Sequence, residues 1–511
     1  MRRPSVLALI LVIALPLHAQ SLGETTFPNS GSPEAQEPFL RGLLLLHSFE
    51  YADARAAFQE ARATDPDFAM AAWGEALTHN HPIWQEQDRE AALAALNGVV
   101  SEGLTEREQA YLGTLDVLYG EGDKEDRDDA FAVAMGELAT AYPDDLDASA
   151  FHALAILGTA HEGRDFSTYM RAAAVAEEVF DRNPRHPGAA HYLIHAYDDP
   201  VHAPLGLRPA RVYAEIAPSA SHALHMPSHI YVALGLWDEA AAMNVRSFDA
   251  AQARDERNGE PVGGHGWHAL QWRVYAELQR GRFDEAQRLL DLAQSLYDAS
   301  STRRALYGLV SARASVVVET EDWDGEAAIR TLQMEEAWPA LRIREAFVHG
   351  FAALRRGDRD QAEFAFEAIQ ADLDSLERGE PALQASALQL EGLLLLDSGE
   401  TDEGLARLEE ATAVEDAMPL DFGPPNPVKP THELLGEALL DLGRANEAII
   451  EFEKALARAP RRMRSLHGLA QAAEAVGDDE TARYARSELR ALLHAADQPI
   501  RDDIGAVQVA R

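Results

Sequence analysis

One pattern of small, aromatic and proline residues recurs along this chain at a fixed spacing. Residues four and three positions apart share one face of a helix, so each copy of the pattern predicts a helix that packs closely on its neighbour. The proline ends that helix because it has no N–H to donate. The three copies are Ala54, Phe58, Ala61 and Pro66; Ala172, Ala176, Val179 and Pro184; and Ala448, Phe452, Ala455 and Pro460.

Short glycine-led segments lie between the predicted helices. GLWDEA (235–240), GRFDEA (281–286) and GRANEA (443–448) resemble the turn between the two helices of a tetratricopeptide repeat. Gly443 and Gly477 are separated by one repeat period of about 34 residues. The resemblance covers most of residues 35–490. It implies an all-α fold, an α-α superhelical solenoid of tetratricopeptide-like helix pairs, in a family that mainly binds proteins and peptides.

Changes in composition divide the chain. Arg2 and Arg3 precede an apolar run that ends near a small residue, which is typical of a secretory signal. We therefore expect a mature protein that begins near Gln20 and works in the periplasm or outside the cell. The predicted segments are 1–19, the signal; 20–34, a polar leader; 35–417, the solenoid; 418–430, a proline-rich linker; 431–495, a C-terminal repeat pair; and 496–511, a tail. Within the solenoid, 198–209 and 255–266 read as loop insertions.

Composition excludes several classes of function. The net charge is −40, and such an acidic chain repels nucleic acid and anionic lipid. Cysteine is absent, which excludes disulfides and thiolate metal sites. After the signal, no apolar run is long enough to span a membrane.

Histidines gather in one part of the chain. Nine of the nineteen lie between His186 and His268, and most fall three or four residues apart, on one helical face. The resemblance to tetratricopeptide repeats places that face on the concave groove of the solenoid. Because neighbouring helices pack about 8–10 Å apart, imidazoles from facing positions could meet over one cation.

We therefore predict a site for a transition metal ion, zinc or copper, both of which suit imidazole ligands. Its predicted ligands are His191, His195, His222, His225, His229 and His268, with His265 as an outer member. Possible supporting residues are Asp198, Asp199, His161 and His81. Asp198 and Asp199 follow His195 by about one turn, where a carboxylate could orient an imidazole.

Two other interpretations of the histidines stay open at the level of sequence. They could line a groove that holds a protein or peptide, or they could be packing residues alone. No catalytic residue is assigned. His191 and His195 have the spacing of a zinc-protease helix, but Tyr192 stands where that mechanism needs a glutamate base. A metal with an open coordination position could still activate water or a substrate.

Overall fold

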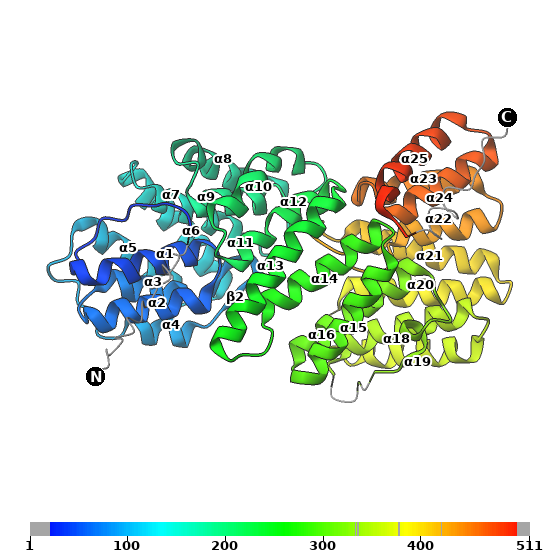
Figure 1. The fold of residues 1–511 in the computed structure, drawn as a ribbon, viewed down its shortest axis with the longest axis horizontal. Coiled ribbons are helices and arrows are strands. Elements are labelled where there is room, and N and C mark those ends of the chain that lie inside the picture. Colours follow the sequence, from blue (N-terminus) through cyan, green and yellow to red (C-terminus); the bar gives the residue numbers. More distant parts are fainter. Residues whose placement is uncertain (1–20, 333, 335–336, 377–378, 421, 498–511) are drawn as a thin grey trace, which may run out of the picture.

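The computed structural model describes residues 21–497, apart from 333, 335, 336, 377, 378 and 421. The predicted signal, residues 1–19, lies outside the described residues. Within them the chain forms successive antiparallel helix pairs that stack side by side, as Figure 1 shows. The all-α solenoid is confirmed, and the described part contains strand only in β1 (Asn80–His81) and β2 (Glu86–Gln87), which pair with each other.

The first half of the chain contains these helices: η1 (Pro33–Ala35), α1 (Gln36–His47), α2 (Tyr51–Thr64), α3 (Ala69–Leu77), η2 (Pro82–Trp84), α4 (Arg89–Leu96), α5 (Glu106–Leu118), α6 (Lys124–Ala141), α7 (Leu146–Gly158), α8 (Phe166–Arg182), α9 (Pro187–Ala196), α10 (Ala203–Ile216), α11 (Ser221–His225), α12 (Pro227–Ala233) and α13 (Trp237–Asn258). The second half contains α14 (Gly264–Gln279), α15 (Phe283–Ser300), α16 (Arg303–Thr320), α17 (Glu326–Ile329), α18 (Pro339–Arg355), α19 (Arg359–Asp374), α20 (Pro381–Asp397), α21 (Thr401–Ala417), α22 (Thr431–Asp441), α23 (Ala445–Arg458), α24 (Met463–Val476), α25 (Asp479–Leu492) and η3 (Leu493–Ala495). None of these described helices combines the length and apolarity that crossing a bilayer requires.

The recurring phenylalanine of the sequence pattern fills a space left by two glycines. Phe58 on α2 is fully buried, and a Cβ added to Gly42 on α1 or to Gly74 on α3 would lie within 3 Å of its ring. Phe452 on α23 has the same relation to a glycine on α22 and another on α24. Glycine therefore lets three successive helices approach around one aromatic ring. This contact explains why the pattern repeats.

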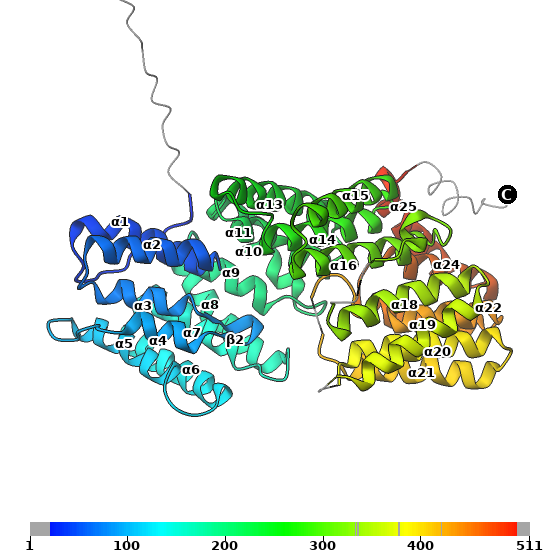
Figure 2. The same ribbon diagram turned by 90° about the horizontal axis from the view of Figure 1, so that it is seen from below.

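The C-terminal repeats turn back onto the middle of the chain, as Figure 2 shows from below. Trp237 on α13 donates its indole N–H to the backbone oxygen of Arg461, at 3.0 Å. Arg462 is buried; its guanidinium contacts the Tyr275 hydroxyl on α14 at 2.9 Å and pairs with Glu433 on α22. A buried cation is held only where it is paired in this way, so these bonds fix how the C-terminal repeats meet the middle of the solenoid.

The two predicted loop insertions are partly wrong. Residues 203–209 belong to α10, because His202 is the N-cap and Pro204 lies in the first turn, where a missing N–H costs nothing. Pro209 lies inside that helix. Similarly α13 continues to Asn258 and α14 begins at Gly264, which leaves a much shorter loop. The 418–430 segment is non-helical as predicted.

The glycine contacts give a stability prediction. Gly468→Ala would place a Cβ 2.2 Å from the Phe452 ring, and we expect a loss of about 1–3 kcal/mol in the free energy of unfolding. Gly113→Ala on α5 is the matched control, since its Cβ would meet open space. Relief of glycine's chain entropy should stabilise that variant by roughly 0.5–1 kcal/mol. Denaturant titration measures both, and equal effects would contradict the packing argument.

Candidate metal centre

Three neighbouring stretches of helix bring the predicted ligands together. His191 and His195 lie on α9, where His186 caps the N-terminus by accepting the Ala189 N–H. The next stretch is broken in two: α11 ends at His225 and α12 begins at Pro227. The broken stretch therefore runs between α9 and α14. It sends His222 toward α9, whereas His225 and His229 face His268 on α14.

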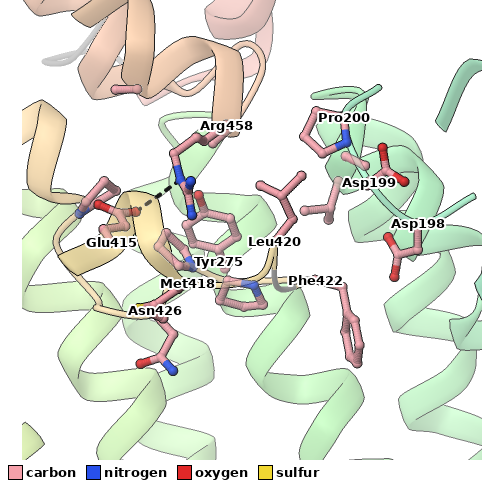
Figure 3. A pocket seen from close by; sticks show the side chains of 18 of the residues that line it. Asp198, Asp199, Pro200, Tyr275, Glu415, Met418, Leu420, Phe422, Asn426 and Arg458 are labelled. Carbon is pink, nitrogen blue, oxygen red and sulfur yellow. Dashed lines mark ion pairs between the residues drawn. The ribbon is translucent and has the colours of Figure 1, made fainter. Parts of the chain in front are cut away.

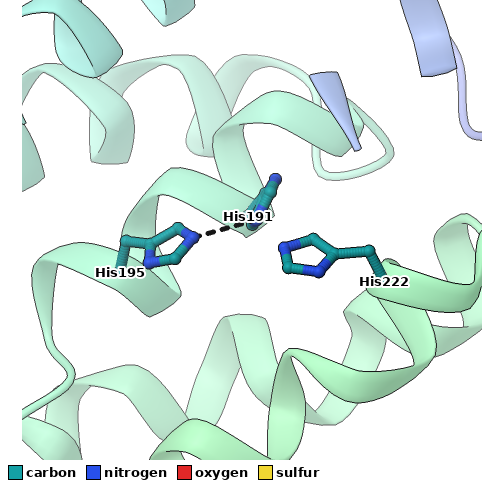
Figure 4. A group of neighbouring side chains, drawn as sticks. All are labelled: His191, His195 and His222. Carbon is teal, nitrogen blue, oxygen red and sulfur yellow. Dashed lines mark hydrogen bonds between the residues drawn. The ribbon is translucent and has the colours of Figure 1, made fainter. Parts of the chain in front are cut away.

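The first group of three consists of His191, His195 and His222 (Figure 4). The Nδ1 of His191 lies 2.7 Å from the backbone oxygen of His47, so it must carry the ring proton and leave Nε2 with a lone pair. That Nε2 faces the Nε2 of His195 at 3.1 Å. The Nε2 of His222 is buried and has no hydrogen-bond partner. One nitrogen from each ring lies within 4.8 Å of the other two.

The second group of three consists of His225, His229 and His268. The Nδ1 of His225 lies 2.7 Å from Oδ1 of Asn244, and the amide is oriented because its nitrogen donates to the Ala240 carbonyl. The Nδ1 of His229 donates to Asp198 at 2.5 Å. Both rings therefore present an unprotonated Nε2, and these two nitrogens face each other at 3.0 Å.

The structure corrects one expectation about these residues. The histidines were placed on the open face of a groove, but five of the six are buried, and His268 is half-buried. Burial lowers the pKa of His191 and of His268 to about 3, because a charged imidazole loses its hydration there. The same effect lowers the pKa of His195, His222 and His225 well below the ordinary value. These five rings are therefore neutral at physiological pH.

His265, the predicted outer member, has a different state. Its side chain is 34% exposed, and its Nδ1 lies 3.1 Å from Glu50. Burial by itself raises the pKa of Glu50, but His265 and hydrogen bonds from the His222 N–H and Ser221 lower it to about 2. In return Glu50 raises the pKa of His265. His265 is thus held as half of an ion pair beside the first group.

The four predicted supporting residues bond to different partners, and one of them contacts a predicted ligand. Asp198 orients His229, as expected. Asp199 instead accepts hydrogen bonds from His202 and pairs with Arg164. Two of the predicted residues bond elsewhere: His161 pairs with Asp129, and His81 lies against Tyr51 and bonds the Thr78 carbonyl.

Two aromatic rings and one amide complete the site and were not predicted. Phe49 packs on the first group, with its ring centroid 4.2 Å from that of His191. Trp272 packs on the second group, 4.4 Å from His229 and 4.8 Å from His225. Asn244 fixes His225. Phe49 also has a φ of 54°, a left-handed conformation that costs a non-glycine residue about 1–3 kcal/mol and is typical of functional sites.

A third buried group lies beside the cluster, formed by His47, Asp147 and His186. Both imidazoles point Nε2 at the same carboxylate oxygen, at 2.8 and 3.3 Å. Nδ1 of His186 accepts the Ala189 N–H, and His47 Nδ1 lies 2.9 Å from the Tyr192 hydroxyl. Each Nε2 therefore carries a proton toward Asp147, so the two imidazoles of this group already share the carboxylate as their partner. The group supports the site through the His47 backbone oxygen.

A pocket adjoins the second group (Figure 3). It lies between the 418–430 segment and the loop that carries Asp198 and Asp199. Phe422 reaches from this segment to His229, with ring centroids 5.2 Å apart. The adjacent Gly423 has a φ of 94° and no room for a Cβ, which would lie 2.4 Å from the Trp272 ring. The segment thus covers the histidines from outside the solenoid.

Comparison with known proteins agrees with this architecture. Residues 430–462 match the family model for the tetratricopeptide repeat. No curated protein sequence matches the chain. Similar solved structures include human IFIT1, solved as a dimer with m7Gppp-AAAA (12% identity, 92% of each chain, TM-score 0.37), and yeast Tom70 (12% identity, 87% of this chain and 89% of that one, TM-score 0.37). A tetratricopeptide repeat protein from Parabacteroides merdae covers 56% of this chain and 97% of its own, at 13% identity and a TM-score of 0.30. Similarity at this level transfers no ligand to this chain.

The buried neutral imidazoles predict a pH dependence of stability. In chelator-treated protein, His191 stays neutral in the fold down to a pH of about 3, whereas in the unfolded chain it takes up a proton below about 6.5. Its contribution to stability is therefore intact above pH 6.5 and is lost as pH falls. Relative to His191→Gln, the parent should lose about 1.4 kcal/mol per pH unit between pH 6.5 and 4. Denaturant titrations at several pH values measure the difference, and parallel curves would show that His191 is not buried as described.

Proposed function

We propose that this chain, a tetratricopeptide-repeat protein, binds a transition metal ion, zinc or copper, through the histidines buried between α9, α11, α12 and α14. The observation that carries the proposal is the pair of nitrogens at the centre of the second group. Nε2 of His225 and Nε2 of His229 are 3.0 Å apart, and the bonds to Asn244 and Asp198 leave both with lone pairs. Two lone pairs facing at this distance repel each other unless a cation lies between them.

A metal ion suits this geometry. Ligand nitrogens bound at about 2.0–2.1 Å in tetrahedral geometry are roughly 3.3 Å apart, close to the separations of 3.0 and 3.1 Å within the two groups. The third nitrogen of each group lies within 4.8 Å of the other two. Rotation of its imidazole ring that moves this nitrogen by about 1 Å would bring it within bonding distance of an ion.

The partners of the rings support the same conclusion. A histidine that binds metal usually donates its other ring N–H to a carboxylate, an amide or a backbone carbonyl, which fixes the tautomer. Three of the histidines do so: His191 to the His47 carbonyl, His225 to Asn244 and His229 to Asp198. Packing alone would not require each Nε2 to be turned inward in this way.

A proton is the competing cation. It would sit on Nε2 of His229 and be donated to the lone pair of His225, which places a charged ring in a buried site. The nearby carboxylate of Asp198 would offset part of that cost, so metal analysis is the deciding measurement.

The chemistry open to the site depends on access. An ion held by three imidazoles keeps a free coordination position, where it could polarise a substrate or activate water. Two pockets adjoin the cluster and could admit such a substrate, one behind Asp198 and Phe422 and one lined by Phe49 and His265. No described side chain near the ion is free to act as a general base, because Asp198 and Glu50 already bind histidines.

The alternative is a scaffold without metal. The tetratricopeptide-repeat fold suggests protein partners, and a peptide could occupy the concave surface. Burial argues against direct contact between that peptide and the histidine cluster. Under this alternative the cluster would be packing alone, and the chain would contain no metal.

Metal content tests the proposal. The parent protein, purified without an affinity tag after growth with added zinc and copper, should retain metal when it is analysed by mass spectrometry. His225→Gln should retain less metal than the parent, because the central ligand pair is broken. His432→Gln is the matched control: it also removes a buried imidazole, yet that ring pairs with Asp416 and Glu451 and belongs to neither group. A metal-free parent, or equal content in both variants, would leave the scaffold as the function.

We also propose export, from the signal at residues 1–19. The packing of the following residues supports a cut near Gln20. Ser21 bonds Ser219, and the side chains of Leu22 and Phe27 are buried, so the chain takes part in the fold from about residue 21 onward.

Sequencing the N-terminus of exported protein should therefore find a start near Gln20. A variant without residues 2–19 should stay in the cytoplasm with its melting temperature unchanged. Exported protein that retains Met1 would refute the signal.

A further inference from the structure

We propose that the cluster holds two copper ions, bound as Cu(I), with one ion in each group of three histidines. This inference rests on the proposed metal binding and adds the number of ions, their identity and the ligands of each.

The first step is the separation of the six imidazoles into two groups. Within each group, the candidate ligand nitrogens all lie within 4.8 Å of one another, but the six do not form a single group. The groups are nevertheless adjacent. The ring centroids of His195 and His229 are 5.8 Å apart, and those of His222 and His225 are 6.1 Å apart. Two ions so placed would be neighbours in one cavity.

The second step is the unsatisfied nitrogen of the first group. Nε2 of His222 is buried without a partner, which costs about 1–3 kcal/mol in the absence of a bond. Because it faces His191 across α9 and α11, the ion that would satisfy it cannot be the one between His225 and His229. A cation would therefore stabilise each group separately. In the first group it would bind a nitrogen without a hydrogen-bond partner, and in the second it would lie between two opposed lone pairs.

The third step is charge. Imidazole ligands bring no negative charge to either group, and the two nearest carboxylates already have partners: Asp198 binds His229, and Glu50 binds His265 and Ser221. Two divalent ions would place four positive charges in a buried site with few anions, and uncompensated buried charge is costly. Two monovalent ions halve that charge.

The fourth step is coordination. Imidazole suits copper as well as zinc, and three nitrogen ligands complete the coordination of Cu(I), whereas zinc held by three histidines takes a water as its fourth ligand. Phe49 packs on the first group and Trp272 on the second, so each group has an apolar ring beside it. Three nitrogens per ion with apolar neighbours favour the monovalent metal.

Titration with Cu(I) under anaerobic conditions, against a chromogenic Cu(I) chelator, counts the ions. The parent should bind two per chain. His222→Gln removes a nitrogen that has no hydrogen bond, and His268→Gln a half-buried ring, so both variants should fold and each should bind one ion. His432→Gln, which removes a buried imidazole on α22 outside both groups, is the control and should bind two. Circular dichroism and melting temperature verify the fold of each variant.

The outcomes separate this inference from the proposed function. If the parent binds one ion and both variants lose it, the cluster is a single shared site. The proposed metal binding would then stand, and the proposal of two ions would be wrong. Zinc that saturates the protein and resists replacement by Cu(I) would overturn the copper assignment. A parent protein that binds no metal of any kind would overturn both proposals. Because the number of ions bound by the parent is measured without any substitution, the proposal of two ions can be refuted even if a variant misfolds.

Discussion

Close approach of helices at small residues is the constraint on which this molecule depends. Where Phe58 sits between Gly42 and Gly74, three helices come together around one ring, and the same contact recurs at Phe452. Near the site, a Cβ on Gly188 would lie 2.4 Å from the His47 ring. This spacing is what allows imidazoles on α9, α11, α12 and α14 to reach one another. A looser stack of helices would separate the same residues by several ångströms and expose each imidazole to water.

Burial then determines what these imidazoles can do. A histidine in water at neutral pH exchanges protons freely, but here the loss of hydration holds the ring neutral and hydrogen bonds choose its tautomer. The comparison with His47 and His186 is instructive, because those rings are equally buried. Their Nε2 protons point at Asp147, whereas the rings of the cluster point lone pairs at each other. The difference lies in the partner of each Nδ1, which decides whether a buried histidine is a packing residue or a potential ligand.

The distant parts of the solenoid also contribute to the site. Arg462, Trp237 and Tyr275 join the C-terminal repeats to the middle of the chain, and this contact fixes the ends of the 418–430 segment. The segment then lies over His229 and Trp272, with Phe422 and Gly423 in contact. A segment read as a linker from its prolines is therefore also a wall of the candidate site. Proline and close packing both restrict the backbone of this segment, which holds Phe422 and Gly423 against the candidate site.

The sequence by itself determined the helical repeats and the histidines that meet. Both follow from local periodicity: residues three and four apart share a face, and a period near 34 residues returns that face to the neighbouring repeat. The six predicted ligands do come together, and Asp198 does orient one of them. Only the tertiary structure decided that the cluster is buried and that it divides into two groups. It also brought in Phe49, Asn244, Trp272 and the His47 carbonyl. Those features depend on contacts between residues far apart in the chain, such as His47 and His191, 144 positions apart. Helical periodicity carries no information about such pairs, because it fixes the direction of a side chain but not what the folded chain places opposite it.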